Sequence, residues 1–194
     1  MRFEELTIAG AMLVHIEPRP DDRGFFARTF CVDEFAAQGL PSAAVQSSIS
    51  YNTRAGTVRG MHFQWPPSQE AKLVRCLRGK LFDVLLDLRP QSPSYLRHQA
   101  LTLDQDNRAA VFIPAGVAHG FQTLADDTEV LYQMTDYYVA ELQSGVRWND
   151  PQFGISWPLQ QIVISDRDAT CADFSRQAYE AEYARRRSSA VQPR

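Results

Sequence analysis

Two of the four histidines lie where they could carry out chemistry. His62 lies in the segment GTVRGMHFQ and His119 in PAGVAHGFQ, and both segments are rich in glycine and polar residues. The other two, His15 and His98, lack such neighbours, and we expect them to be structural or exposed. Histidines on separate strands of a small barrel can point into one cavity, because alternate residues of each strand face the interior. We therefore expect a site around His62 and His119.

The two segments resemble the paired motifs of the cupin superfamily, whose members are small jelly-roll barrels. In metal-binding cupins the first motif offers His-x-His and a glutamate, and the second offers another histidine. Here the first motif reads His62-Phe63-Gln64, so one ligand is missing, and Lys72 would oppose a divalent cation if it faced inward. Because a metal site needs about three good ligands or more, we expect no metal. A metal-dependent cupin enzyme such as a dioxygenase is the alternative.

Without a metal, the same cavity would hold groups that move protons. Histidine is a base that works near neutral pH, and His62 would take that role. The alternating segment TEVLYQMTDYY offers the phenol of Tyr132, while Lys72 and Arg59 offer cations. Such groups can remove a proton next to a carbonyl, stabilise the enolate and return a proton to the opposite face. That sequence of steps inverts a stereocentre, so the predicted reaction is an epimerisation.

The surrounding chain is expected to be mainly β and to form one domain over residues 1–194. Its 44% hydrophobic and 22% charged residues are ordinary for a globular protein. From residue 45 to about 138, short alternating segments between turn signals predict a sandwich or barrel. The other expected elements are a strand at 6–16, a short helix in VDEFAAQGLP, a hairpin over 72–88 that turns at Gly79, a helical segment over 171–187, and a flexible tail at about 185–194.

Composition and charge exclude several classes of protein. The net charge of −3 argues against a nucleic-acid-binding protein, which would normally be basic. Three scattered cysteines, Cys31, Cys76 and Cys171, argue against a disulfide framework or a zinc knuckle. No apolar segment reaches the length of about 20 residues that spans a membrane, and the N-terminus does not resemble a signal peptide. We expect a cytoplasmic globular protein.

Six longer motifs make the resemblance specific. They are DDRGFF, GTVRGMHFQ, EAKLVRCLRGKLFDVLLDLRPQSPSY, VFIPAGVAHGFQTLADDTEVLYQMTDYY, GVRWNDPQFGISWP and ISDRD. Together, from about residue 3 to 170, they resemble the dTDP-4-dehydrorhamnose 3,5-epimerase family. The resemblance implies a cupin double-stranded β-helix (jelly-roll) barrel with a few short helices, one of them C-terminal, and no cofactor. It also implies a homodimer in which N-terminal strands of one subunit help to shape the partner's site.

The same resemblance implies the reaction and its catalytic residues. The substrate would be a nucleotide-linked 4-keto-6-deoxyhexose of the dTDP-4-dehydro-6-deoxyglucose type, inverted at C3, C5 or both during deoxysugar biosynthesis. His62 would be the base, Asp168 of ISDRD would orient and charge it, and Tyr132 would be the acid on the opposite face. Lys72 would stabilise the enolate at the C4 oxygen. A carboxylate on the far imidazole nitrogen is physically sensible, because it fixes the tautomer and raises basicity.

Further residues match positions that bind substrate in the family. Arg59 and His119 would hold the diphosphate and sugar, Arg23 and Gln46 the nucleotide, Tyr138 would be an aromatic platform near the base, and Asp83 would support the cavity face. For Asp83 and Tyr138, ordinary packing or an ion pair would explain the residue equally well.

Four positions depart from the family pattern. Arg28 and Gln143 stand where glutamate is common, and Arg167 stands where lysine is common. Gln46-Ser47-Ser48 stands where Gln-x-Asn is common, so Ser48 replaces an asparagine. Arginine is a natural bidentate partner for phosphate, so the first change can alter what is bound. We expect the chemistry to be kept while the nucleotide or sugar can differ. A single-centre epimerase acting on a different nucleotide sugar, or a non-catalytic sugar-nucleotide binding protein, would also fit the sequence.

Overall fold

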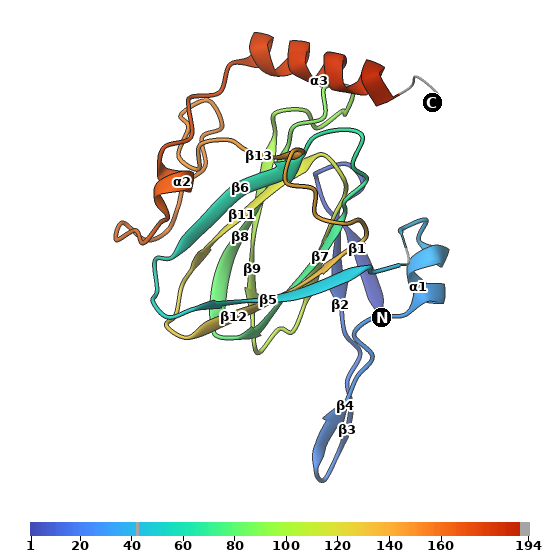
Figure 1. The fold of residues 1–194 in the computed structure, drawn as a ribbon. Coiled ribbons are helices and arrows are strands. Elements are labelled where there is room, and N and C mark those ends of the chain that lie inside the picture. Colours follow the sequence, from blue (N-terminus) through green and yellow to red (C-terminus); the bar gives the residue numbers. More distant parts are fainter. Residues whose placement is uncertain (42, 191–194) are drawn as a thin grey trace.

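Two antiparallel sheets packed face to face make up most of the computed structural model, which describes residues 1–41 and 43–190 (Figure 1). The six-stranded sheet runs in the order β1 (Arg2–Glu5), β2 (Met12–His15), β10 (Ala110–Ile113), β7 (Lys72–Arg78), β12 (Thr128–Met134) and β5 (Gln46–Asn52). The five-stranded sheet runs in the order β13 (Gln143–Gly145), β6 (Val58–Gln64), β11 (Val117–Thr123), β8 (Lys80–Asp87) and β9 (His98–Asp104). The predicted jelly-roll barrel is confirmed.

Three apolar clusters hold this barrel together. One fills the space between the sheets and includes Leu85, Phe121 and Val130, each fully buried. A second covers the outer face of the five-stranded sheet, where α3 (Arg176–Ala190) contributes Tyr179. A third lies on the outer face of the six-stranded sheet under α1 (Val32–Ala37). Because the outer faces are partly covered in this way, central strands such as β8 and β11 are buried on both sides.

The predicted hairpin over residues 72–88 is wrong in its pairing. β7 pairs with β10 and β12, whereas β8 pairs with β9 and β11, so the two strands belong to different sheets. Gly79, at φ 77°, turns the corner between them. The alternation of Val84 and Leu86 against Asp83 is present as expected, but alternation fixes the faces of a strand and not its partner.

Two predictions at the chain ends are also wrong. The expected strand over residues 6–16 is a hairpin of β1 and β2, and its turn contains Gly10 at φ 79°. The expected flexible tail at 185–194 is helical through residue 190, where Arg185 and Arg186 pair with Glu182. Residues 191–194 lie outside the described part of the chain. The short helix predicted in VDEFAAQGLP is confirmed as α1.

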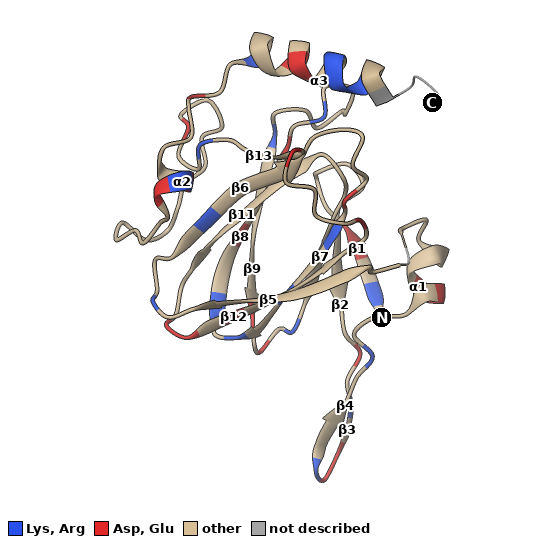
Figure 2. Cartoon of the chain, viewed as in Figure 1, with Lys and Arg blue, Asp and Glu red and all other residues tan. Residues whose placement is uncertain are grey.

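Two smaller features stand outside the barrel. A two-stranded arm, β3 (Arg19–Asp21) and β4 (Gly24–Phe26), extends away from it (Figure 1). α2 (Asp166–Ala169) lies against one end of β6. Positions of both charge signs are interspersed along the chain (Figure 2). None of the described helices is long and apolar enough to cross a membrane.

Candidate active site

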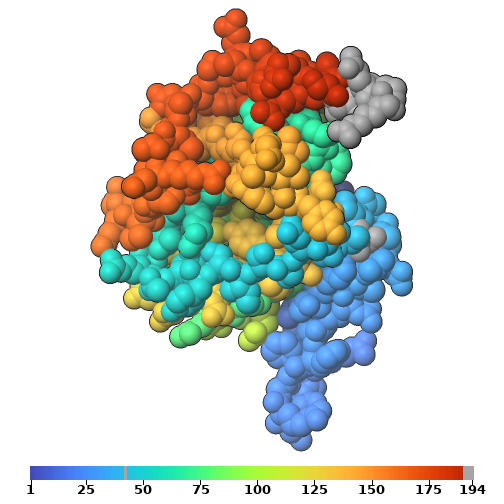
Figure 3. Space-filling view, in the orientation of Figure 1, coloured from blue at the N-terminus to red at the C-terminus, as the bar shows by residue number. Residues whose placement is uncertain are grey.

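Two adjoining cavities lie between the sheets, and they share His62, Lys72 and Tyr132. The first, here called the arginine lobe, has a volume of about 230 Å³. Its lining is completed by Ser50, Arg59 and His119. The second, here called the tyrosine lobe, has a volume of about 200 Å³. Its lining is completed by Ser48, Phe63, Gln64, Glu70, Met134, Tyr138 and Gln143. In the space-filling view the surface is hollowed between β5 and the orange segment that contains β13 (Figure 3).

The shared residues come from both walls of the barrel. His62 lies on β6 of the five-stranded sheet, while Tyr132 and Lys72 lie on β12 and β7 of the six-stranded sheet. His62 and Tyr132 therefore approach the cavity from opposite sheets. A molecule between them would have an imidazole on one side and a phenol on the other.

A bulge in β6 brings Arg59 and His62 to the same cavity. Simple alternation would place residues three apart on opposite faces. Here His62 pairs with His119 and Arg59 with Phe121, so one extra residue is inserted on β6. Gly60 allows this geometry: at φ 129°, an added Cβ would lie 2.5 Å from the Cα of Gly120. The glycines beside the two histidines thus position the site.

His62 forms a hydrogen-bonded pair with Asp168 of α2, at 2.7 Å from its Nε2 to Oδ1. The other carboxylate oxygen accepts the backbone N–H of Gly60 at 3.2 Å. Ser165 caps α2 by accepting the N–H of Asp168. The carboxylate is only 5% exposed. The Nδ1 atom of His62 has no hydrogen-bond partner among residues 1–41 and 43–190, and His62 is partly exposed to the cavity.

The hydrogen bond to His62 helps to keep Asp168 ionised. Burial acts to raise the pKa of Asp168, but hydrogen bonding and attraction to His62 and the bond from Gly60 outweigh it, with a smaller contribution from Arg167, so the pKa lies below its usual value. Asp168 is therefore an anion near neutral pH. An anion on Nε2 holds the ring proton there and leaves Nδ1 as the basic nitrogen. His62 is arranged as a proton acceptor.

A second pair joins His119 to Asp83, at 2.7 Å from Nε2 to Oδ2. Both side chains are buried, and the other oxygen of Asp83, Oδ1, has no partner within the described part of the chain. The ring of His119 meets the ring of Tyr132 edge-on, with 5.8 Å between centroids. Asp83 thus holds the ring of His119 through Nε2, and its predicted role in supporting the cavity face stays a prediction.

Tyr132 is held in its neutral form. Burial raises the pKa of its phenol well above the ordinary value of 10, and the negative charge of Asp83 adds to this, while Arg59 opposes it. A phenol that keeps its proton can donate it to a carbanion or enolate carbon. Tyr132 is therefore arranged as a proton donor.

The two cations of the site are each fixed by a neighbour that the sequence did not single out. Lys72 forms an ion pair with Glu70, and Arg59 donates from Nε to Oδ1 of Asn52 at 2.8 Å. Glu70 stands two residues before Lys72, a spacing that places both side chains on one face of an extended segment. That spacing was a signal for Glu70. Asn52 ends the preceding strand, β5, which belongs to the other sheet, and no local pattern indicates the contact.

The remaining predicted residues fall into two groups. Ser48, Tyr138 and Gln143 line the tyrosine lobe, where the Tyr138 hydroxyl donates to Gln143. Gln46 stands behind them and accepts the backbone N–H of Tyr138 at 2.7 Å. The structure thus brings these four together.

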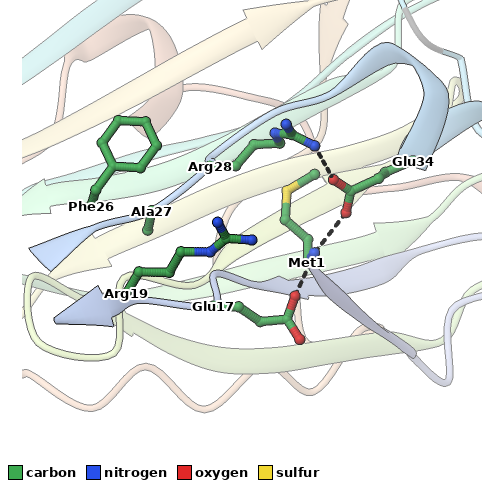
Figure 4. Close-up of a pocket in the computed structure, with 7 residues that line it drawn as sticks. All are labelled: Met1, Glu17, Arg19, Phe26, Ala27, Arg28 and Glu34. Carbon is green, nitrogen blue, oxygen red and sulfur yellow. Dashed lines mark hydrogen bonds and ion pairs between the residues drawn. The ribbon is translucent and has the colours of Figure 1, made fainter.

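The other three predicted residues lie outside both lobes of their own chain. Arg167 is exposed on α2 beside Asp168. Arg23 lies at the tip of the arm and pairs with Asp21. Arg28 pairs with Glu34 in a separate pocket of about 170 Å³ near the N-terminus (Figure 4). Their binding roles stay predictions.

Within the described residues, no group of three or more His, Cys, Asp or Glu side chains is placed to hold a metal ion. The nearest candidates, His62 and His119, each direct Nε2 to a carboxylate. What the cavity offers is a base, a neutral acid and two cations.

Comparison with known proteins gives consistent matches over most of the chain. The sequence profile of the dTDP-4-dehydrorhamnose 3,5-epimerase family matches residues 5–176. A dTDP-4-dehydrorhamnose 3,5-epimerase from Sinorhizobium fredii is 42% identical over 171 residues, which cover 88% of this chain and 88% of that protein. A dTDP-4-dehydrorhamnose 3-epimerase from Streptomyces niveus is 38% identical over 169 residues, covering 87% of this chain and 81% of that protein.

Solved structures agree with the sequence matches. The crystal structure of dTDP-4-dehydrorhamnose 3,5-epimerase from Bacillus anthracis, with TDP and pyrophosphate bound, superposes with a TM-score of 0.86. It is 36% identical, and the match covers 89% of this chain and 99% of that one. The likeness thus extends to the whole barrel and not to a single motif.

Proposed function

The chain belongs to the dTDP-4-dehydrorhamnose 3,5-epimerase family, and from this premise we propose that it inverts C3, C5 or both of a nucleotide-linked 4-keto-6-deoxyhexose. It is an isomerase of the cupin jelly-roll fold. The observation that carries the proposal is the cavity between the sheets, with the His62–Asp168 pair on one wall and Tyr132 on the other.

The first step is removal of a proton by His62. Its Nδ1 takes a proton from the carbon next to the C4 carbonyl, and the electrons of that C–H bond form a carbon–carbon double bond as the carbonyl π electrons move to oxygen. Asp168 stabilises the imidazolium that results, because its depressed pKa keeps it anionic. The Lys72 ammonium, which lines both lobes, neutralises the enolate oxygen.

The second step returns a proton from the other wall. Tyr132 gives its phenolic proton to the same carbon, the carbonyl re-forms, and the configuration at that carbon is inverted. The enzyme is then left with an imidazolium and a phenolate, which are reset when the first loses a proton to solvent and the second gains one. Because burial raises the pKa of Tyr132, the phenol is regained readily at neutral pH.

The two lobes divide the substrate between them. Arg59 and His119 support placing sugar and diphosphate oxygens in the arginine lobe. Tyr138, Gln143 and Ser48 support placing the nucleoside in the tyrosine lobe. The ligands named for the Bacillus anthracis structure, TDP and pyrophosphate, are of this chemical kind.

The departures from the family pattern bear on specificity at two positions. Ser48 and Gln143 line the tyrosine lobe, so their side chains can select the nucleoside. Arg28 and Arg167 line neither lobe of their own chain and would act only through another route. The relatives named as 3,5-epimerases and as a 3-epimerase are similarly close, which leaves both outcomes within the proposal.

The proposal includes a homodimer whose arms reach the partner's site. The arm of β3 and β4 stands away from its own barrel, with Phe26 77% exposed and Arg23 at its tip (Figure 1). β5 is an edge strand beside the cavity and exposes Ile49. An exposed apolar arm and an open edge are surfaces that pairing between copies would cover.

The unpaired thiols of Cys31, Cys76 and Cys171 suit a reducing compartment and support action in the cytoplasm.

A mixing experiment tests this arrangement. His62→Asn removes the base, and Arg23→Ala removes the arm contact. If the arm serves the partner, mixed dimers contain one intact site, and equal amounts of the two variants recover up to about a quarter of wild-type activity. No recovery after subunit exchange, or a monomer in sedimentation, would contradict the dimer.

The reaction itself is tested by NMR in deuterated water with a panel of 4-keto-6-deoxyhexoses linked to different nucleotides. We expect metal-independent incorporation of deuterium at C3, C5 or both, and loss of incorporation in His62→Asn. Full-rate exchange by that variant would refute His62 as the base. Absence of exchange by the wild type with every substrate would refute the epimerase.

A further inference from the structure

Glu70 occupies a position that the reaction described above does not use. Its side chain is 8% exposed, and that of its ion-pair partner Lys72 is 14% exposed, so the carboxylate and the ammonium are both largely withdrawn from water. One oxygen of Glu70 accepts from Lys72 and the other accepts from Nε2 of Gln64 at 2.9 Å. Glu70 therefore bridges the enolate-stabilising lysine and the last residue of β6.

Gln64 in turn holds the segment that carries Tyr138. Its Oε1 accepts the backbone N–H of Val139 at 3.0 Å, and its Nε2 also donates to the carbonyl of Tyr137 at 3.2 Å. Because the backbone N–H can only donate, Oε1 must face Val139, and Nε2 must then face Glu70. The orientation of the amide is thus fixed by its partners.

We propose that Glu70 is a positioning residue: it holds the Lys72 ammonium at the junction of the two lobes and ties it, through Gln64, to the Tyr138 segment. This rests on the proposed function for the role of Lys72 in the reaction and for the placement of the nucleoside against Tyr138. An ammonium has three donors on a flexible four-carbon stem, and one fixed carboxylate directs the remaining donors toward the substrate oxygen. The carboxylate also compensates the buried charge before the enolate forms.

The tie has a consequence for substrate recognition. The backbone around Tyr138 and the catalytic ammonium are connected by consecutive hydrogen bonds through Gln64 and Glu70. A nucleoside bound against Tyr138 therefore contacts the same hydrogen-bond network that fixes the position of the Lys72 ammonium. We expect loss of Glu70 to impair turnover more than binding.

The chain contains only two lysines, Lys72 and Lys80, which makes the contact directly observable. In protein labelled with ¹³C at the lysine Cε, two signals are expected, and Lys80, which is exposed on β8, is an internal reference. Glu70→Gln keeps the size of the side chain and removes its charge. We expect this variant to shift the Lys72 signal and leave the Lys80 signal in place. An unmoved Lys72 signal would overturn the contact.

The kinetic test separates positioning from a general structural role. We expect Glu70→Gln to lower kcat by about tenfold to a hundredfold, the loss typical of one hydrogen bond to a charged group, with KM changed less than about threefold. In a Lys72→Met background the same change should have almost no further effect, because the group it positions is gone. Equal losses in both backgrounds, or a raised KM at unchanged kcat, would overturn the proposal.

Two controls keep these outcomes distinct. Glu141→Gln changes an exposed glutamate near the same segment and should leave kcat and both lysine signals unchanged. If Glu70→Gln does not fold, Glu70→Asp carries the same tests, since a carboxylate one methylene shorter cannot reach Lys72 and Gln64 together. If the wild type shows no exchange at all, the proposed function fails, while the lysine spectrum still decides whether Glu70 holds Lys72.

Discussion

Replacing Asp168 by asparagine should disable His62 without removing it. The carboxylate accepts two hydrogen bonds, from Nε2 of His62 at 2.7 Å and from the N–H of Gly60 at 3.2 Å. A carboxamide has one acceptor oxygen and one donor group, so it cannot accept both. If its oxygen faces Gly60, its NH₂ faces Nε2, and the ring proton must move to Nδ1, the nitrogen that should be free.

The opposite orientation also fails. If the oxygen faces His62, the NH₂ meets the buried N–H of Gly60, and two donors oppose each other. In either orientation the negative charge that stabilises the imidazolium is gone. A hydrogen bond to a charged group contributes about 1.5–3 kcal/mol, which corresponds to a loss of about 10- to 150-fold in kcat. KM should change little, because Asp168 lies behind His62 and lines neither lobe.

The assay is deuterium incorporation into the sugar nucleotide, followed by NMR at saturating and at low substrate. Asp166→Asn is a matched control, since Asp166 lies on the same short helix but is exposed. It should exchange at the wild-type rate. If the exchange rate of Asp168→Asn is within about threefold of the wild-type rate, the carboxylate neither orients His62 nor stabilises its protonated form, and the assignment of the pair is wrong.

Three further predictions follow from single contacts. Tyr132→Phe should keep proton removal by His62 but lose the proton donor for inversion. NMR in deuterated water should therefore show deuterium incorporated into the starting epimer, while the rate of product formation falls by about a hundredfold or more. Gly60→Ala should lower the free energy of unfolding in urea by about 2–4 kcal/mol, because the added Cβ would meet Gly120. Gly39→Ala is the control: Gly39 has a positive φ but no atom within 4 Å of an added Cβ, so the free energy of unfolding should fall by only about 1 kcal/mol. The depressed pKa of Asp168 gives stability that is fully present above the ordinary carboxyl pKa and is lost as pH falls through the lower folded-state pKa. The difference in unfolding free energy between wild type and Asp168→Asn should therefore narrow in acid, and a difference that stays constant as the pH is lowered would contradict this.

The convergence of the cavity residues was predictable because it depends on local rules. His62 and His119 lie in glycine-rich strands of a barrel, and the structure pairs them directly across β6 and β11. The alternation of the segment around Tyr132 places its side chain on an interior face. Periodicity and turn residues are encoded within a few neighbours, so a single sequence reveals them.

What escaped prediction depends on how successive strands are placed in the two sheets. The strands on either side of Gly79 look like a hairpin, yet each pairs within its own sheet, and alternation cannot distinguish these outcomes. Asn52 became a partner of Arg59 only when β5 and β6 were placed together. Glu70 was two residues from Lys72, but its bond to Gln64 requires the end of β6 to close on the loop before β7. These partners follow from the fold and not from the pattern.

The structure contains the same kind of histidine–carboxylate pair twice, and the difference between the two supports the proposal that His62 is the base. His119 is 4% exposed and lines only the arginine lobe, with Asp83 fully buried behind it. His62 is more exposed, lines both lobes, and keeps Nδ1 free of partners within the described chain. A base must reach the substrate carbon and then exchange its proton with solvent, whereas a residue that only binds substrate can be shielded from water. His62 meets the first requirement and His119 the second, which supports the proposal that the same chemical pair serves catalysis at one position and substrate binding at the other.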